Sequence, residues 1–324
     1  MARIEAWAVD DIGEVTAGTD LAALVVEAAA ADLADGDIVL VTSKVVSKAE
    51  DRVVTGDRDQ AILDQTVRVV ARRGATAIVE NHLGLVMAAA GVDGSNVEPG
   101  RVVLLPEDPD SSAAALRVRV HAETGRNVAV VVTDTAGRAW RTGQTDLAVG
   151  VAGLEPLEEF AGRTDAYGNE LAVTAPAVAD ELASVAELVS GKLSGRPVTV
   201  VRGLSHRVLE AGSHGPGARA LLRPRDQDMF ALGAREAVLA AVRGRDADCF
   251  GTPAPAEEVL AALESCGLTG AVAGVSVRVD LPAHDLRDQV VAAERVRLVA
   301  HAHGWRPHSD TGSGDTLTVS PTPP

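Results

Sequence analysis

Aromatic residues are scarce in this sequence of 324 residues, which has three Trp, three Phe and one Tyr. The chain is nevertheless 46% hydrophobic, which is ample for a core. That core must be built from Val, Ala and Leu rather than from aromatic rings. The length predicts one large domain or two smaller ones.

Cysteines and long apolar runs are also few. The two cysteines, Cys249 and Cys266, match neither a disulfide framework nor a zinc site in number or spacing. No stretch stays apolar for the roughly 18 residues of a membrane-spanning helix. The opening segment MARIEAWAVDD carries acids where a secretory signal would be apolar. We therefore expect a cytoplasmic protein without a membrane partner.

Basic residues are outnumbered by acids. The chain has 30 Lys and Arg against 46 Asp and Glu, which gives a formal net charge of -16 and a pI near 4.9. Binding to DNA or RNA needs clustered Lys and Arg, so a nucleic acid partner is not expected. A small phosphorylated ligand needs only a local basic pocket and is compatible with this charge.

Strand and helix patterns alternate along the first two thirds of the chain. Predicted strands are 3–9, 37–43, 76–80, 84–88, 101–105, 127–133, 145–153 and 197–204, and predicted helices are 21–34, 58–73, 110–123 and 175–192. The fold class that follows is α/β, a mixed α+β domain, over residues 1–245. Residues 246–308 are predicted to form a small C-terminal appendage of unclear role. Residues 309–324 have the composition of a disordered tail.

Common nucleotide-binding and metal-binding motifs are absent. The segment VSGKLSG contains Gly191 and Lys192, but Leu193 stands where a Walker A loop has Ser or Thr, so it is not a P-loop. The informative features are instead polar clusters at strand ends.

Two of these clusters precede residue 101. VTSKVVSKAEDR (41–52) places Ser43, Lys44, Ser47 and Lys48 after a buried strand, where hydroxyl and ammonium groups suit phosphate; a solvated loop is the alternative. AAAGVDGSNVEPG (88–100) offers the oxygens of Asp93 and Asn96 to a hard cation, or simply forms an Asx turn.

The third cluster is VVTDTAGRAWRTGQTDLAVG (131–150). Asp134 and Thr135 follow an apolar strand, at the place where open α/β sheets bind ligands. Mg²⁺ needs only one or two protein carboxylates, so these residues with Asp93 would be enough. Arg138 and Arg141 could hold an anionic substrate; a capped, salt-bridged turn is the alternative.

The fourth cluster, FAGRTDAYGNELAVT (160–174), contains Arg163 and Tyr167. The rings of Phe160 and Tyr167 in this cluster, and of Trp140 in the third, could stack on a flat ligand or pack a local core.

Several segments in the same order carry a family resemblance. They are VTSKVVSKAEDRVV, AGVDGSNVEPG, TDTAGRAWRTGQTDLAVGVAGLEPL, GRTDAYGNELAVT, VADELASVAELVSGK and PVTVVRGL. Together they resemble the coenzyme F420-0:L-glutamate ligase family, the gamma-glutamyl ligases of deazaflavin coenzyme biosynthesis. The resemblance covers residues 1–245 and implies the F420 gamma-glutamyl ligase-like fold and a homodimer.

The resemblance also implies a reaction. GTP, as co-substrate, and a divalent metal, Mg²⁺ or Mn²⁺, activate the terminal carboxylate of coenzyme F420-0 as an acyl phosphate. The amine of L-glutamate attacks it, and a second round adds a γ-linked glutamate to F420-1. GDP and phosphate leave, and a monovalent cation such as K⁺ assists.

Family roles carry over to matching residues. Asp93, Asp134 and Thr135 match the metal site. Asp134, Arg138 and Arg141 are assigned to catalysis. The assignment of Arg138, Arg141 and Arg163 to an anionic substrate rests on their charge alone. Nucleotide contacts carry over to Ile12, Gly13, Glu14, Val15, Ser43, Lys48, Asn96, Ser190, Gly191, Lys192, Leu193, Ser194, Gly195 and Arg196. Lys192 departs from the pattern, because some members have a metal-binding acid there.

Two other functions remain open at this stage. The same pocket could hold nucleotide or deazaflavin in a non-catalytic sensor, although a sensor need not keep the metal ligands. An amide ligase for a different carboxylate is equally compatible with the motifs. Residues 226–250 resemble the junction to a flavin-binding nitroreductase-like domain in some relatives, but too few residues follow for that fold, so no FMN site is expected.

Overall fold

The computed structural model describes residues 3–282, 285–309 and 316–322. The chain divides into two compact units. The first comprises Met1–Arg68 and Thr76–Leu222, and the second comprises Val69–Ala75 and Arg223–Pro324. The first unit therefore ends before the boundary at residue 245 that the sequence suggested.

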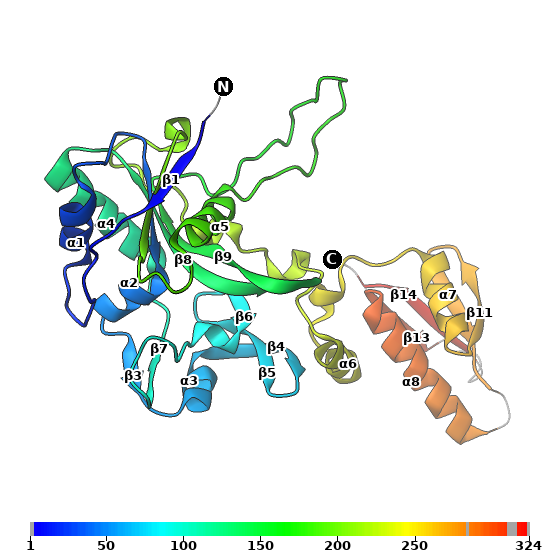
Figure 1. Cartoon of the computed structure of the whole chain (residues 1–324). Coiled ribbons are helices and arrows are strands. Elements are labelled where there is room, and N and C mark those ends of the chain that lie inside the picture. Colours follow the sequence, from blue (N-terminus) through cyan, green and yellow to red (C-terminus); the bar gives the residue numbers. More distant parts are fainter. Residues whose placement is uncertain (1–2, 283–284, 310–315, 323–324) are drawn as a thin grey trace. The chain divides into compact units, whose positions relative to one another are not determined.

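A five-stranded sheet forms the centre of the first unit (Figure 1). Its order is β1 (Glu5–Ala8), β10 (Val198–Arg202), β2 (Ile38–Thr42), β8 (Ala129–Arg138) and β9 (Arg141–Ala152). Strands β2 and β8 are parallel, and all other neighbours are antiparallel. The predicted mixed α/β class is confirmed.

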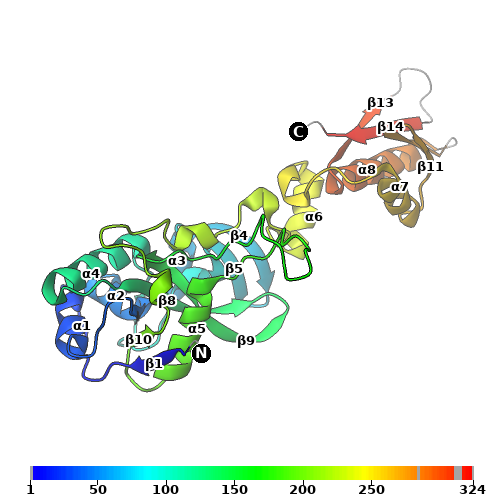
Figure 2. The same cartoon turned by 90° about the horizontal axis from the view of Figure 1, so that it is seen from above.

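Both faces of this sheet are buried by helices (Figure 2). Helices α1 (Leu21–Ala29) and α4 (Pro109–Thr124) cover one face, and α5 (Val178–Ser190) covers the other. Side chains alternate between the faces along each strand: Val39 and Val41 pack towards α1 and α4, whereas Ile38 and Leu40 pack towards α5. Small aliphatic residues thus fill both layers, as the scarcity of aromatics predicted.

Capping side chains and glycine fix the ends of the helices over the first face. Asp20 accepts a hydrogen bond from the main-chain N–H of Ala23 at 3.0 Å and begins α1. Asp108 caps α4, Pro109 occupies its first turn, and Gly125 ends it at φ 71°.

Several smaller elements lie between β2 and β8 in the sequence. Helix α2 (Ser43–Ala49) follows β2, and the others are β3 (Val53–Thr55), α3 (Arg58–Gln65), β4 (Thr66–Arg73), β5 (Thr76–Asn81), β6 (Val86–Ala88) and β7 (Arg101–Val103). Short 3₁₀ turns lie at Ala89–Gly91, Ser205–Arg207, Ala218–Leu221, Arg225–Gln227 and Ala247–Phe250.

The predicted helix over 58–73 is wrong in its second half. Helix α3 ends at Gln65, and β4 begins at Thr66. The segment TVRVVARR is rich in β-branched Val, which loses side-chain freedom in a helix and packs well on a pleated strand. The apolar pattern that suggested one long helix belongs to two elements.

Strand β8 continues further than expected. It runs to Arg138 and turns into β9, so the polar residues of 131–150 lie on a long hairpin rather than in a loop. Trp140, at φ 65° and 86% exposed, lies in the turn. The start of α4 packs against β9 so closely that a Cβ atom on Gly150 would overlap the main chain of Pro109.

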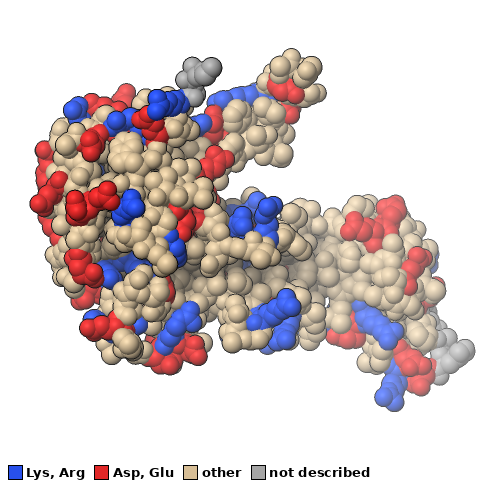
Figure 3. Space-filling view, in the orientation of Figure 1, with Lys and Arg blue, Asp and Glu red and all other residues tan. Residues whose placement is uncertain are grey.

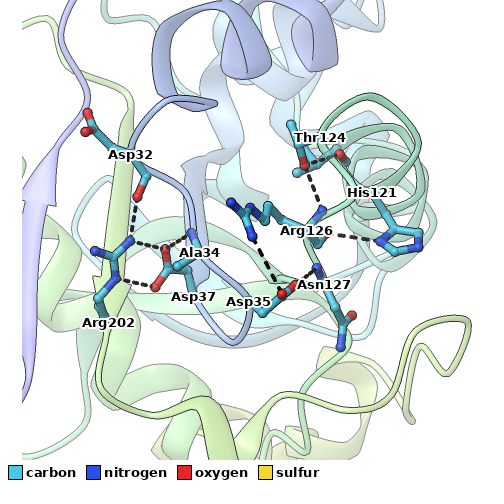
Figure 4. Close-up of polar contacts among 10 residues, drawn as sticks. Asp32, Ala34, Asp35, Asp37, His121, Thr124, Arg126, Asn127 and Arg202 are labelled. Carbon is cyan, nitrogen blue, oxygen red and sulfur yellow. Dashed lines mark hydrogen bonds and ion pairs between the residues drawn. The ribbon is translucent and has the colours of Figure 1, made fainter.

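The amino-terminal end of β2 is held by a polar network (Figure 4). Asp37, with its side chain 1% exposed, accepts hydrogen bonds from Arg202 at 2.7 and 2.8 Å. Asp35 accepts from the main-chain N–H of Asn127 at 2.7 Å. These contacts tie β2 to β10 and to the start of β8, at the end opposite to Thr42.

The second unit has its own sheet and core. Strands β11 (Thr269–Ala273), β12 (Ser276–Asp280), β14 (Thr316–Pro321) and β13 (Trp305–Ser309) are antiparallel in this order. Helices α7 (Ala256–Ser265) and α8 (Leu286–Ala302) pack over the strands in Figure 1, around a core that includes Val277 and Val296. Helix α6 (Ala234–Arg243) precedes them.

The predicted disordered tail is wrong for Thr316–Pro321, which forms strand β14. Val319 is fully buried and pairs with Val277, so an alternating apolar pattern outweighs the Ser, Thr and Pro content of the segment. Residues 310–315, 323 and 324 of that predicted tail lie outside the described residues.

The structure shows how the charged side chains are distributed and whether its helices could cross a membrane. Acidic and basic side chains are interspersed over the face of the first unit shown in Figure 3. Of the helices in the described ranges, none has both the length and the apolar character that crossing a bilayer requires.

Candidate active site

A cavity of about 560 Å³ opens where the parallel strands β2 and β8 end. Four separate parts of the chain contribute to it: the loop after β1, helix α2, the 93–101 loop and the turn after α5. Its lining residues include Ile12, Gly13, Glu14, Val15, Lys44, Lys48, Asn96, Thr133, Thr135, Asp146, Ser190, Gly191, Lys192, Leu193, Gly195 and Arg196. Most of the residues predicted to contact nucleotide therefore line one cavity.

Asp134 and Ser43 join the ends of the two parallel strands. The pairing of β2 with β8 ends at Thr42 opposite Thr133, and the next residues are Ser43, which begins α2, and Asp134 of β8. The Ser43 hydroxyl donates to Oδ1 of Asp134 at 2.8 Å. Asp134 therefore follows the end of the parallel pairing, as expected, but the strand itself continues to Arg138.

Asp134 has the most perturbed carboxyl of the site. Its burial raises its pKa to about 6, and the charges of Asp146 and Asp93 act in the same direction. The hydrogen bond from Ser43 opposes the shift without cancelling it. The charges of Asp93 and Asp146 thus oppose ionisation of Asp134, and of these three carboxylates Asp146 lines the cavity.

Asp93 is paired with a lysine. The ammonium of Lys44 lies 2.6 Å from its Oδ2 and also donates to Ser95 Oγ at 2.6 Å. Burial alone would raise the pKa of Asp93, but hydrogen bonds from Lys44 and Ser95 outweigh it and lower the pKa. Asp93 is therefore held ionised beside Lys44, which lines the cavity.

Thr135 is contacted by a second lysine. Lys192, on the turn after α5, donates to Thr135 Oγ1 at 2.8 Å, and Thr135 donates to Asp146 Oδ1 at 2.7 Å. On the opposite wall, Lys48 donates to Glu14 at 3.1 Å. Three ammonium groups thus face one cavity, which concentrates positive charge in a protein of net charge -16.

A second cavity adjoins the first. It has a volume of about 600 Å³ and shares Glu14, Val15, Lys48 and Asn96 with it. Arg101 lies in its wall. Two ligands that must react with each other could therefore meet near Lys48.

The residues present fit a hard divalent cation. Asp93, Asp134 and Thr135 offer carboxylate and hydroxyl oxygens, the donors that Mg²⁺ and Mn²⁺ prefer, and Mg²⁺ keeps much of its shell for water and phosphate. In the described part of the chain, no group of three or more His, Cys, Asp or Glu forms a ready metal cage. In these residues the protein thus supplies part of a coordination shell and not a closed cage.

Some predicted residues lie elsewhere. Arg138 and Arg141 lie at the exposed end of the β8–β9 hairpin, where Arg138 donates to the Thr142 carbonyl at 3.3 Å. Among the other predicted site residues, Ser43, Asp93, Asp134 and Ser194 are not part of the cavity lining either.

The fourth polar cluster forms an extended loop, visible in green in Figure 1. Asp165 accepts from the N–H groups of Tyr167 and Asn169, and Tyr167 is 93% exposed, so this ring packs in no core. The guanidinium of Arg163 lies 4.9 Å from the centre of the Phe160 ring.

Sequence reasoning assigned no role to Thr133 and Asp146. Lys44 was one of the two lysines of 41–52 considered for phosphate, but the family resemblance carried over only Lys48. Asp146 belongs to the second Thr-Asp pair of 131–150, and the hairpin register that brings it opposite Thr135 could not be seen before β9 was known to begin at Arg141.

Comparison with known proteins adds an independent finding. Residues 11–203 match the model of the F420-0:Gamma-glutamyl ligase family. A coenzyme F420:L-glutamate ligase of Methanothermobacter thermautotrophicus is 38% identical over 240 residues, which cover 67% of this chain and 94% of the relative.

Two further relatives have the same name. One from Halobacterium salinarum is 41% identical over 252 residues, covering 69% of this chain and 94% of its own. One from Methanopyrus kandleri is 38% identical over 238 residues, which cover 67% of this chain and 93% of the relative.

Proposed function

Because the chain belongs to the F420-0:gamma-glutamyl ligase family, we propose that it is a ligase of coenzyme F420 biosynthesis that attaches L-glutamate to coenzyme F420-0. GTP is the proposed phosphoryl donor. The observation that carries this proposal is the single cavity lined by residues from the four segments that resemble the family's nucleotide site.

The proposed reaction makes an amide in two steps. The terminal carboxylate of the acceptor takes the γ-phosphoryl group of GTP, which gives an acyl phosphate and GDP. The glutamate amine, having lost its proton, attacks the acyl carbon; the bond from carbon to the phosphate oxygen breaks and phosphate leaves. A second round adds glutamate through the γ-carboxylate of the first.

Charge complementarity assigns the lysines to the nucleotide. A triphosphate is strongly anionic, and Lys44, Lys48 and Lys192 all line the cavity with their ammonium groups held by short contacts. Such groups neutralise phosphate oxygens and align the donor with the acceptor carboxylate. The adjoining cavity beside Lys48 gives the acceptor a place to approach.

Asp93, Asp134 and Thr135 are the proposed holders of a divalent metal, Mg²⁺ or Mn²⁺. When bound, the ion would neutralise charge that develops on the transferred phosphoryl group. The chain's own contribution is to keep Asp93 ionised through Lys44 and to orient Asp134 through Ser43.

The test is GDP formation by the full chain. Release of GDP is expected only with coenzyme F420-0, L-glutamate and a divalent metal together, and with GTP in preference to ATP. Lys48→Met is expected to raise the KM for GTP by about 10- to 100-fold, because it removes a charged hydrogen bond to phosphate. Arg119→Gln, which removes an exposed cation of α4, is the matched control.

Tight GTP binding without turnover would refute the ligase and favour the sensor. Turnover that requires a different carboxylate would instead favour the other amide ligase. The expected homodimer and the assistance by K⁺ are further parts of the proposal, which sedimentation velocity and omission of K⁺ from the assay would test.

A further inference from the structure

Asp146 is an acid of the cavity that neither the motifs nor the family resemblance assigned. Asp146 lies on β9 directly opposite Thr135 of β8 and is only 6% exposed. Among the described residues it forms no ion pair. A buried carboxylate at this position needs hydrogen-bond donors, and β8 supplies them.

Two hydroxyl groups of β8 bind the two oxygens of this carboxylate. Thr135 Oγ1 donates to Oδ1 at 2.7 Å, and Thr133 Oγ1 donates to Oδ2 at 3.3 Å. The main-chain carbonyl of Asp146 accepts from Ser184 Oγ of α5 at 3.3 Å, which fixes the backbone next to it. Two hydrogen bonds therefore hold the carboxylate, and a third holds the backbone that carries it.

The orientation of the Thr135 hydroxyl follows from proton counting. A hydroxyl has one proton to donate and lone pairs to accept. The ammonium of Lys192 can only donate, so Thr135 Oγ1 accepts from it at 2.8 Å. The single Thr135 proton must then go to Asp146. The lone pairs of Thr135 consequently face the cavity.

We propose that Asp146 is a positioning residue, which accepts the Thr135 proton and so keeps the Thr135 oxygen turned towards the cavity as a ligand for a cation. In the structure that cation is the ammonium of Lys192. A divalent metal would bind the same lone pairs, and for this second cation the inference rests on the proposed function. A metal can use a hydroxyl oxygen only if its proton points elsewhere, and acceptors behind a ligand commonly secure this.

The test is a titration of Mn²⁺ into the nucleotide-free protein. The signal of free Mn²⁺ in electron paramagnetic resonance measures how much remains unbound. Asp146→Asn is expected to weaken Mn²⁺ binding by about 10- to 100-fold, the usual effect of losing an acceptor behind a ligand. The amide keeps the size of the carboxylate but brings a donor that competes for the Thr135 lone pairs. Thermal unfolding of each variant verifies that it is folded.

A double-variant cycle separates positioning from a general effect of charge. Thr135→Val is expected to cause a similar loss, and Thr135→Val combined with Asp146→Asn no further loss. Thr142→Val, which removes an exposed hydroxyl near the start of β9, is the control and is expected to keep wild-type affinity. Asp146→Ser is a second, smaller substitution with the same expected direction.

Wild-type Mn²⁺ affinity in folded Asp146→Asn, or additive losses in the double variant, would overturn the inference. Failure of wild-type protein to bind Mn²⁺ would overturn it as well. Coupled losses of Mn²⁺ affinity in a protein that forms no amide would uphold the positioning role and refute the proposed function, so the two failures are distinguishable.

Discussion

Replacing Asp134 by Asn is expected to stabilise the metal-free protein while destroying its turnover. The carboxyl is buried beside Asp146 and Asp93, and its pKa is raised from 3.8 to about 6. Keeping it ionised therefore costs free energy in the folded state. The shift of roughly two pKa units corresponds to at most about 3 kcal/mol, and we expect about 1 to 3 kcal/mol because the site is not fully closed to water.

The sign of the pH dependence follows from the direction of the shift. Because the folded-state pKa is above the unfolded value, the protonated carboxyl favours the folded state. Its stabilising contribution is complete below pH 3.8 and is lost as the pH rises through about 6. The Asn variant has no such loss, so its advantage over wild type should be small at pH 4 and complete above about pH 7.

Urea unfolding in the presence of a chelator measures this difference at several pH values. Turnover of the same variant with saturating metal should fall by roughly two orders of magnitude, about 3 kcal/mol of lost transition-state stabilisation. A folded Asn variant that is less stable than wild type at pH 8 would refute the electrostatic argument. Near-normal turnover would refute the role of Asp134 in holding the metal.

Three other substitutions test separate parts of the structure. Lys44→Met should weaken GTP binding by about tenfold, measured by calorimetry, because a cation is lost from the cavity; unchanged affinity would contradict its role. Asp37→Ala should lower the free energy of unfolding by roughly 3 kcal/mol, since Arg202 loses its buried partner; a loss under 1 kcal/mol, by urea titration, would show that the pair is dispensable. Gly150→Ala should cost about 2 kcal/mol or more by overpacking α4, and an unchanged melting temperature would contradict the close contact.

Sheet positions were largely predictable because burial leaves a clear pattern. Val-rich runs such as 37–43 and 127–133 can hardly be anything but strands covered on both faces. Once they are parallel neighbours, the polar residues that follow each of them must meet. The sequence indicated that Ser43 and Asp134 each follow an apolar strand, but it did not pair them; the structure joins them by a hydrogen bond.

Contacts that depend on strand register were not predictable. Asp146 reaches Thr135 only because β8 and β9 form one continuous hairpin with a register shift between Val132 and Thr133. No local pattern in the sequence specifies that pairing. For the same reason Arg138 and Arg141, near in sequence to Asp134, are carried by the hairpin to its exposed end.

Short elements were the other source of error. The segment 66–73 combines apolar spacing with β-branched residues, and pattern alone could not decide between helix and strand. Strand β14 was hidden because Ser, Thr and Pro surround its buried Val319. In both cases pairing with other strands, rather than local preference, decided the structure.

The most direct test of the ligase assignment is mass spectrometry of the reaction products. Purified protein would be incubated with coenzyme F420-0, L-glutamate, Mg²⁺ or Mn²⁺, and either GTP or ATP. The account predicts a GTP-dependent product that is heavier by one glutamyl residue, followed by a second, γ-linked addition. An unmodified coenzyme, in a sample that binds GTP tightly, would contradict it.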